Sequence, residues 1–453
     1  MPPINLKKNI LLSGGFRIVV LLLSFVFSWI SARYLGVELK GKFSYFITLG
    51  GFIWIVLDLG LYRSFPFLVR KFPEKVSSMF AWIVLCFASE TIILGLLGFS
   101  LLDYWSRISG FYFSSIYMLC FIGFITLTKA FMQLQSLFMG LDKIMDHSIA
   151  HFLNTIVGLT LLIVGYLFFR DSDRLLFLLV LTVVSIISSF CFLLFRHNWG
   201  FWIRDIDFKF IFKAYGFGIR VFLSSLFILL LLKADILIVR RMLGFSDVGI
   251  YSIAAHIVDL LQVASNMVGG LLLVKLSDTE DMISKWHLMK KMLMVFFVLL
   301  SLSNIGFIIV GKFILAYMFG KQFVPVYYTY LWLIPASYGL SFGSLFNNYL
   351  NSKGFPVISI VLPALALIVN IGLNLLLIPV LGIYGSALAT SIAYSLWFIF
   401  IIAYEQKSTK GVMLHHLKPS VADWKELYQM GIAILAQAKQ RLINSLHHSE
   451  NGR

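Results

Sequence analysis

Long apolar stretches dominate the chain and alternate with short polar segments. Each stretch is long enough to cross about 30 Å of hydrocarbon as a helix. Helices are expected because lipid offers the backbone no hydrogen-bond partners, and the alternating ten-residue strands of a membrane barrel are absent from the sequence. The twelve predicted spans are 10–32, 43–69, 79–102, 111–138, 148–169, 175–195, 213–238, 249–274, 291–311, 328–350, 355–379 and 384–404.

One short phrase occurs twice, 208 residues apart. SARYLGVELKGKFSYF (Ser31–Phe46) and VRRMLGFSDVGIYSIA (Val239–Ala254) share five of sixteen positions. The copies follow the first and seventh spans, so an even number of crossings separates them and both lie on the same side of the membrane. This arrangement predicts a parallel repeat of two six-helix bundles. We expect Gly36, Gly41 and their partners in the second copy to shape the turn into the next helix.

The repeat predicts four parts of the chain. They are an N-terminal six-helix lobe (1–200), a cytoplasmic linker (201–212), a C-terminal six-helix lobe (213–404) and a cytoplasmic tail (405–453). The tail places apolar residues at helical spacing among lysines between Val421 and Leu442. This pattern is typical of an amphipathic helix that lies on the inner membrane surface.

Composition and charge agree with a multi-pass membrane protein. Sixty per cent of residues are hydrophobic and 13% are charged, whereas soluble domains carry about a quarter charged residues. The net charge of +16 fits basic loops beside anionic lipid better than nucleic-acid binding. Inner loops carry more Lys and Arg than outer loops when the N-terminus is inside, so we expect both termini in the cytoplasm and the protein in the cytoplasmic (inner) membrane.

Ionisable residues inside the spans are the candidate functional residues. A charge at a lipid-facing position in mid-membrane costs about 2.5–3.5 kcal/mol, so such residues pair, reach toward the surface or line a wet cavity. Lys129 and Arg220 lie toward the ends of their spans, where either of the last two alternatives is open. The candidates are basic residues Arg17, Arg63, Lys129, Arg220 and Lys233, carboxylates Asp58, Asp235 and Asp259, and His256.

Helical spacing suggests which of these residues share a face. Ser252, His256 and Asp259 recur at intervals of four and three, which places them on one face of a helix. A second stripe contains Thr126, Lys129, Gln133 and Ser136. The first stripe continues to Asn266 and partly repeats 208 residues earlier as Ser44, Thr48, Gly51 and Asp58. Polar stripes at equivalent places in the two halves predict a hydrophilic cleft between the lobes. His256 beside Asp259 is a candidate proton or sodium site, with a structural histidine as the alternative.

Lys233 and Asp235 cannot share a helix face. They are two residues apart, so their side chains project about 160° from each other. We expect one of them to face the cleft and the other to pair with a neighbouring helix.

The sequence offers no support for enzyme chemistry. It has no Gly-rich phosphate loop, HExxH, CxxC or G-x-S-x-G motif, and we expect no metal and no cofactor. The predicted outer loops are short, which disfavours a membrane-embedded polysaccharide polymerase or glycosyltransferase.

Two motifs resemble those of a transporter family. The phrase at Ser31–Phe46 resembles the signature after the first helix of Wzx-type polysaccharide-repeat-unit (O-antigen) flippases, in the multidrug/oligosaccharidyl-lipid/polysaccharide exporter superfamily. NIGLNLLLIPVLGIYGSALAT (Asn370–Thr390) is similar to a second pattern of that family. The resemblance implies a V-shaped transporter that moves an undecaprenyl-pyrophosphate-linked oligosaccharide to the outer leaflet by alternating access, alongside other polysaccharide assembly proteins.

The resemblance also implies roles for residues. Related precursor flippases bind pyrophosphate with cationic residues on their first, second and seventh helices, where this chain has Arg17, Arg63, Arg220 and Lys233. A Na⁺ or H⁺ gradient would supply the driving force, with Asp58, Asp235 or Asp259 as the carboxylate. A cation-coupled multidrug exporter of the same superfamily is the alternative function.

Overall fold

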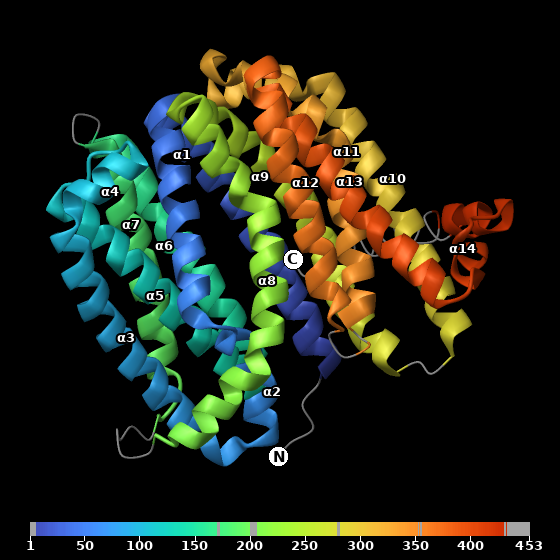
Figure 1. Ribbon diagram of the computed structural model, residues 1–453, viewed down its shortest axis with the longest axis horizontal. Coiled ribbons are helices and arrows are strands. Elements are labelled where there is room, and N and C mark those ends of the chain that lie inside the picture. Colours follow the sequence, from blue (N-terminus) through green and yellow to red (C-terminus); the bar gives the residue numbers. More distant parts are fainter. Residues whose placement is uncertain are drawn as a thin grey trace, which may run out of the picture.

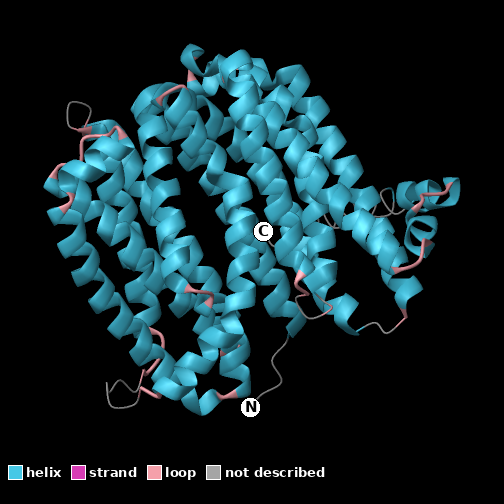
Figure 2. Cartoon of the chain, in the orientation of Figure 1, coloured by secondary structure: helices cyan, strands magenta, loops and turns pink. Residues whose placement is uncertain are grey.

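A computed structural model describes residues 6–169, 173–199, 206–278, 281–351, 353, 356–429 and 432. Within its helices, the side chains of residues 6–14, 17, 220 and 264–278 lie outside the description. The described residues form helices joined by short turns, with no strand among them (Figure 2).

The helices form two bundles, seen left and right in Figure 1. The first contains α1 (Leu6–Asp58), α2 (Leu61–Lys71), α3 (Val76–Ser100), α4 (Leu102–Ser109), α5 (Ser115–Gly140), α6 (Ile144–Phe168) and α7 (Arg174–Phe195). The second contains α8 (Phe208–Met242), α9 (Phe245–Asp278), α10 (Met282–Ile314), α11 (Val324–Asn351), α12 (Ile358–Leu381), α13 (Ile383–Ser408) and α14 (Val412–Leu417). Each bundle has its own apolar core.

Polar side chains fix where several helices begin. An Asp or Ser just before the first turn accepts hydrogen bonds from backbone N–H groups that have no partner inside the helix. The capping residues are Ser114 before α5, Asp173 before α7, Asp207 before α8 and Asp281 before α10. The apolar residues that follow then remain helical across the membrane.

Nine stretches of the described residues are long and apolar enough to cross a membrane. One of them, Ile18–Asp58, has 41 residues and breaks at Gly36 (φ 75°, ψ 179°), so α1 provides both the first and second predicted spans. The eighth and tenth predicted spans lie in α9 and α11, which are also long helices. The expected all-helical fold of about twelve spans in two repeated bundles is confirmed.

Two predicted boundaries were wrong. The second span does not run unbroken to residue 69, because Leu59 (φ 48°) and Gly60 (φ 87°) interrupt the helix after Asp58. The predicted linker 201–212 is partly helical, since α8 begins at Phe208; residues 201–205 lie outside the described residues. The limits of the two lobes stay a prediction.

The two copies of the repeated phrase lie against each other where α1 and α9 cross, near the top of Figure 1. A Cβ added to Gly41 would lie 1.8 Å from the Phe245 carbonyl oxygen, and one added to Gly249 would lie 2.1 Å from that of Val37. Ser44 Oγ donates to Ser252 Oγ over 3.0 Å. Gly36 and Gly244 have the positive φ of a turn, as expected, whereas Gly41 and Gly249 allow the two bundles to touch.

A second contact between the bundles joins α2 to the start of α8, at the bottom of Figure 1. A Cβ added to Gly60 would lie 2.4 Å from the Gly218 carbonyl oxygen. The rings of Phe67 and Phe217 stack with centroids 5.1 Å apart. The region between the bundles is therefore bounded by close packing near both ends of α8.

The described part of the tail packs on α10. Residues 421–429 are helical, and Asp423 and Glu426 form ion pairs with Lys290 (2.8 Å) and Lys291 (2.7 Å). These contacts tether the start of the predicted amphipathic helix, while residues 433–453 lie outside the described residues.

Candidate functional site

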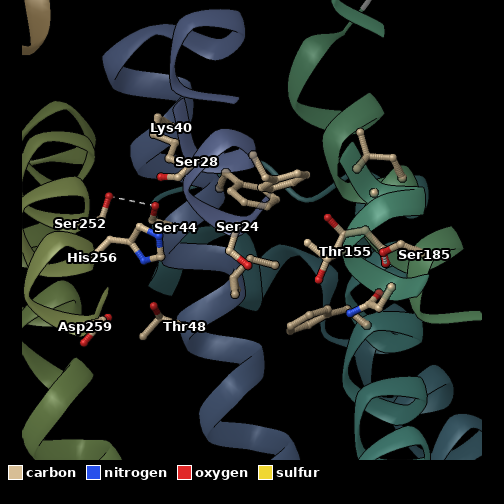
Figure 3. A pocket seen from close by; sticks show the side chains of 18 of the residues that line it. Ser24, Ser28, Lys40, Ser44, Thr48, Thr155, Ser185, Ser252, His256 and Asp259 are labelled. Atoms are coloured by element: carbon tan, nitrogen blue, oxygen red, sulfur yellow. Dashed lines mark hydrogen bonds between the residues drawn. The ribbon is translucent and has the colours of Figure 1, made fainter. Parts of the chain in front are cut away.

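Two adjoining cavities lie between the bundles. The first, about 420 Å³, is lined from α1, α5, α6, α7, α8 and α9 by many hydroxyl groups, and we call it the hydroxyl cavity. The second, about 530 Å³, extends toward α2 and contains His147, His151 and His256, and we call it the histidine cavity. Both include Ser24, His256 and Asp259, so they form one continuous space. Figure 3 shows Ser24 on α1 between α9 and the α6–α7 pair.

Three of the predicted site residues meet in this space. Lys233 of α8 and Asp259 of α9 form an ion pair of 2.6 Å with both side chains 29% exposed, and His256 lies one turn from Asp259. The predicted stripe of Ser252, His256 and Asp259 therefore faces the cavity. Pairing with Asp259 offsets the charge of Lys233, so this wall is polar and nearly neutral overall.

Lys40 is a cavity residue that the sequence reasoning missed. It was assigned to a loop, but it lies on the second arm of α1, buried, with Nζ donating to Ser31 Oγ over 2.8 Å. Lys40 precedes Ser44 and Thr48 by one and two helical turns, and all three line the hydroxyl cavity. That four-residue spacing was the available signal.

His147 and His151 were also missed. They lie one turn apart on α6, with ring centroids 5.1 Å apart, and both line the histidine cavity with Tyr62 of α2. Their four-residue spacing placed them on one face in the sequence. Across the described residues, no group of three or more His, Cys, Asp or Glu side chains is placed to hold a metal ion.

The structure places Lys129 and Asp58 inside the first bundle, away from both cavities. Lys129 is buried and pairs with Glu90 of α3. Asp58 is buried and accepts hydrogen bonds from the backbone N–H groups of Gly60 and Tyr62 and from Gln133. Asp58 therefore caps α2. The predicted stripe on α5 is an internal polar seam and not a wall of the cleft.

Asp235 lies inside the second bundle, opposite Lys233 as the spacing predicted. Its carboxylate accepts hydrogen bonds from Tyr251 (2.6 Å) and Thr390 (2.7 Å), and Asn374 Nδ2 lies 3.4 Å away. Within the described residues, Asn374 Oδ1 is buried without a hydrogen-bond partner. The polar residues of Asn370–Thr390 thus surround one buried carboxylate.

Of the three predicted arginines, Arg63 has a described side chain, and it meets the histidine cavity only through Tyr62. Arg63 is exposed on α2 and stacks on Tyr62, with no ion pair to a described residue. Arg17 lies in α1, four residues before the cavity residue Leu21, and Arg220 lies in α8. The side chains of Arg17 and Arg220 lie outside the description.

Transporters of known structure share this fold. The chain superposes on the lipid II flippase MurJ in an inward closed conformation with a TM-score of 0.69 and 14% identity, covering 94% of this chain and 96% of that one. The comparison with an inward-facing multidrug resistance MATE family transporter of the MOP superfamily gives a TM-score of 0.68 and 13% identity, covering 90% of this chain and 99% of that one. A third similar structure is a MOP superfamily transporter from Pyrococcus furiosus, described as having a binding pocket of reverse polarity. Its TM-score is 0.63 at 13% identity, covering 91% of this chain and 97% of that one.

At such identities these likenesses show the fold alone, and no curated protein sequence matches this chain. The family model described as "Polysaccharide biosynthesis protein" matches residues 6–274, more than half of the chain, including both copies of the repeated phrase. The resemblance seen in the sequence is confirmed at this level: the chain belongs to the polysaccharide biosynthesis protein family and has the same fold as these transporters.

Proposed function

We propose that this protein is a flippase that moves an undecaprenyl-pyrophosphate-linked oligosaccharide from the cytoplasmic to the outer leaflet, for O-antigen or another surface polysaccharide. The observation that carries the proposal is the hydroxyl-rich cavity between two membrane-spanning bundles of a chain in a polysaccharide biosynthesis family. We place it in the cytoplasmic membrane with both termini inside, where it works with other polysaccharide assembly proteins.

The cavity offers a polar path for groups that lipid would exclude. Sugars and pyrophosphate lose their hydrogen bonds to water in hydrocarbon, and the cavity replaces them with hydroxyl, imidazole and amino groups. Lys40 supplies positive charge, whereas the charge of Lys233 is offset by Asp259. The polyprenyl chain remains in the lipid between helices and needs no site of its own.

Alternating access requires the contact between α1 and α9 to open. With the N-terminus inside, the repeated phrase lies at the outer face, so Gly41 and Gly249 close the outer end in this conformation. A substrate reaches the outer leaflet only when these helices separate. The contact between Gly60 and Gly218 lies at the opposite end and takes the corresponding part on the inner side.

We assign ion coupling to Asp235. Asp235 is buried without an ion pair to a described basic residue, and its hydrogen bonds come from Tyr251, Thr390 and Asn374, so a proton or Na⁺ would neutralise its charge. A bound cation would offset the cost of burying this charge. Asp259 is less suited, because Lys233 already pairs with it.

A cation-coupled multidrug exporter is the second candidate. Asp259 and the rings of Phe27, Phe43 and Phe124 line the hydroxyl cavity, and a carboxylate with aromatic rings suits an organic cation. Lys40 in the same cavity opposes such a ligand, and Asp259 is already paired with Lys233, so we favour the flippase.

Deletion of the gene separates the two functions. The flippase proposal expects single polyprenyl-linked repeat units to accumulate, measured by mass spectrometry of extracted lipids, with drug sensitivity unchanged. A plasmid copy restores the normal profile. A normal lipid profile together with increased sensitivity to cationic drugs would reject the flippase in favour of the exporter.

A further inference from the structure

The wall that α6 and α7 contribute to the hydroxyl cavity differs from the wall that α8 and α9 contribute. Its polar residues are Asn154, Thr155, Thr182 and Ser185, all uncharged, while the facing wall contains Lys233, His256 and Asp259. Figure 3 shows Thr155 and Ser185 on one side of α1 and His256 and Asp259 on the other. The cavity therefore has a neutral side and a charged side.

Each hydroxyl group of the neutral side donates its hydrogen bond to a backbone carbonyl of its own helix. Thr155 Oγ1 donates to the His151 carbonyl (3.0 Å), Thr182 Oγ1 to the Leu178 carbonyl (2.7 Å) and Ser185 Oγ to the Thr182 carbonyl (2.8 Å). A hydroxyl that donates to its own helix still has lone pairs that accept. The wall thus presents a row of hydrogen-bond acceptors.

Asn154 adds one more acceptor to this row. Its Oδ1 atom is buried and has no hydrogen-bond partner among the described residues, although the side chain lines the cavity. A buried polar atom without a partner is costly, and a ligand that donates to it would relieve that cost.

An acceptor wall selects the chemical class of its ligand. Pyrophosphate carries only acceptors at neutral pH, so it finds no partner in these three hydroxyls or in Asn154 Oδ1 and can accept only from Asn154 Nδ2, whereas each sugar hydroxyl can donate one hydrogen bond. Phe27 and Phe124 line the same cavity and offer flat apolar surfaces for the C–H faces of sugar rings. The volume of about 420 Å³ lies within the range of about 300–1,000 Å³ that small-ligand sites occupy.

We propose that this side of the cavity, formed by Asn154, Thr155, Thr182 and Ser185, is the subsite that binds the sugars of the lipid-linked substrate. The inference rests on the proposed flippase function and orients the cargo: sugars lie against α6 and α7, and the pyrophosphate lies toward the basic groups across the cavity.

Binding of two lipids to the purified protein tests the subsite. The probes are undecaprenyl pyrophosphate alone and the same lipid carrying a neutral disaccharide of N-acetylhexosamines, with dissociation constants from native mass spectrometry. The wild type is expected to bind the glycolipid about tenfold more tightly, as one or two net hydrogen bonds would give. The variant Thr155→Val/Thr182→Val/Ser185→Ala is expected to bind both lipids equally, with unchanged affinity for the sugar-free lipid.

A matched control removes equivalent hydroxyls that do not line either cavity. Thr160 and Ser188 lie on the same two helices and donate to the Ile156 and Ser185 carbonyls, each over 2.8 Å. Thr160→Val/Ser188→Ala is expected to keep the wild-type preference. The single variant Thr155→Val, expected to lower the preference about threefold, provides the same readout if the triple variant does not fold.

The outcomes separate the subsite from the function on which it rests. A triple variant that keeps the tenfold preference, or that loses affinity for both lipids equally, overturns the subsite. Equal binding of the two lipids by the wild type overturns the subsite and leaves the flippase proposal intact. A wild type that binds neither lipid overturns both.

Discussion

Transport is expected to fall to background when Gly41 is replaced by leucine. The crossing of α1 and α9 has no room for a side chain, since even one carbon at Gly41 would lie 1.8 Å from the Phe245 carbonyl oxygen. Overpacking typically costs about 1–3 kcal/mol, which lowers the population of the closed state about 5- to 150-fold, and leucine exceeds this because the obstacle is backbone. The measurement is the flipping rate in proteoliposomes, together with the distance between spin labels at the outer end of the two bundles.

Gly51→Ala is the matched control for this prediction. Gly51 lies on the same helix, and a Cβ added there meets nothing within 4 Å, so transport and the label distance are expected to stay at wild-type values. Wild-type transport in Gly41→Leu would mean that α1 and α9 do not need this contact to close the outer end.

Asp235→Asn is expected to remove the response of transport to an ion gradient. Asparagine has the same shape as aspartate and leaves the neighbouring Tyr251 and Thr390 in place. It lacks the negative charge that would hold a proton or Na⁺. A gradient that lowers the transport barrier by about 1–3 kcal/mol would raise the rate about 5- to 150-fold, and this increase is expected to be absent in the variant. The rate is measured in proteoliposomes with and without imposed Na⁺ and H⁺ gradients.

Asp58→Asn provides the comparison with a second buried carboxylate. Backbone N–H groups of Gly60 and Tyr62 and the amide of Gln133 already surround Asp58, so its replacement is expected to lower thermal stability and leave the gradient response unchanged. A gradient response that disappears in Asp58→Asn and persists in Asp235→Asn would reverse the assignment.

Local patterns in the sequence predicted much of the fold. Apolar length placed the helices, the repeat placed the turns at Gly36 and Gly244, and helical spacing placed Lys233 and Asp235 on opposite sides of α8. Each of these depends on residues close together in the chain. Lys40 follows the same spacing. It was missed because the first predicted span ended at residue 32 and the second began at residue 43, whereas α1 is helical on both sides of Gly36.

These local patterns could not predict contacts between helices that are far apart in the sequence. Nothing near Lys129 in the sequence shows that Glu90 of α3 neutralises it, and the break after Asp58 falls at a leucine with positive φ, a conformation that leucine rarely adopts. Gly41 and Gly249 were visible as a repeat, yet their mutual contact follows only from how the two bundles pack. The sequence alone therefore could not distinguish polar residues of a buried network from polar residues that line the cavity.

Flipping by the purified protein tests the central claim most directly. The wild type is reconstituted with undecaprenyl-pyrophosphate-linked oligosaccharide, and the fraction that an external glycosidase cleaves is followed over time. The comparison is a Ser44→Cys/Ser252→Cys variant, lacking the native cysteines, whose new thiols replace hydroxyls 3.0 Å apart and form a disulfide across the outer end. We predict time-dependent flipping by the wild type, none by the oxidised variant and recovery after reduction. Equal rates in protein-free liposomes and with wild-type protein would contradict the account.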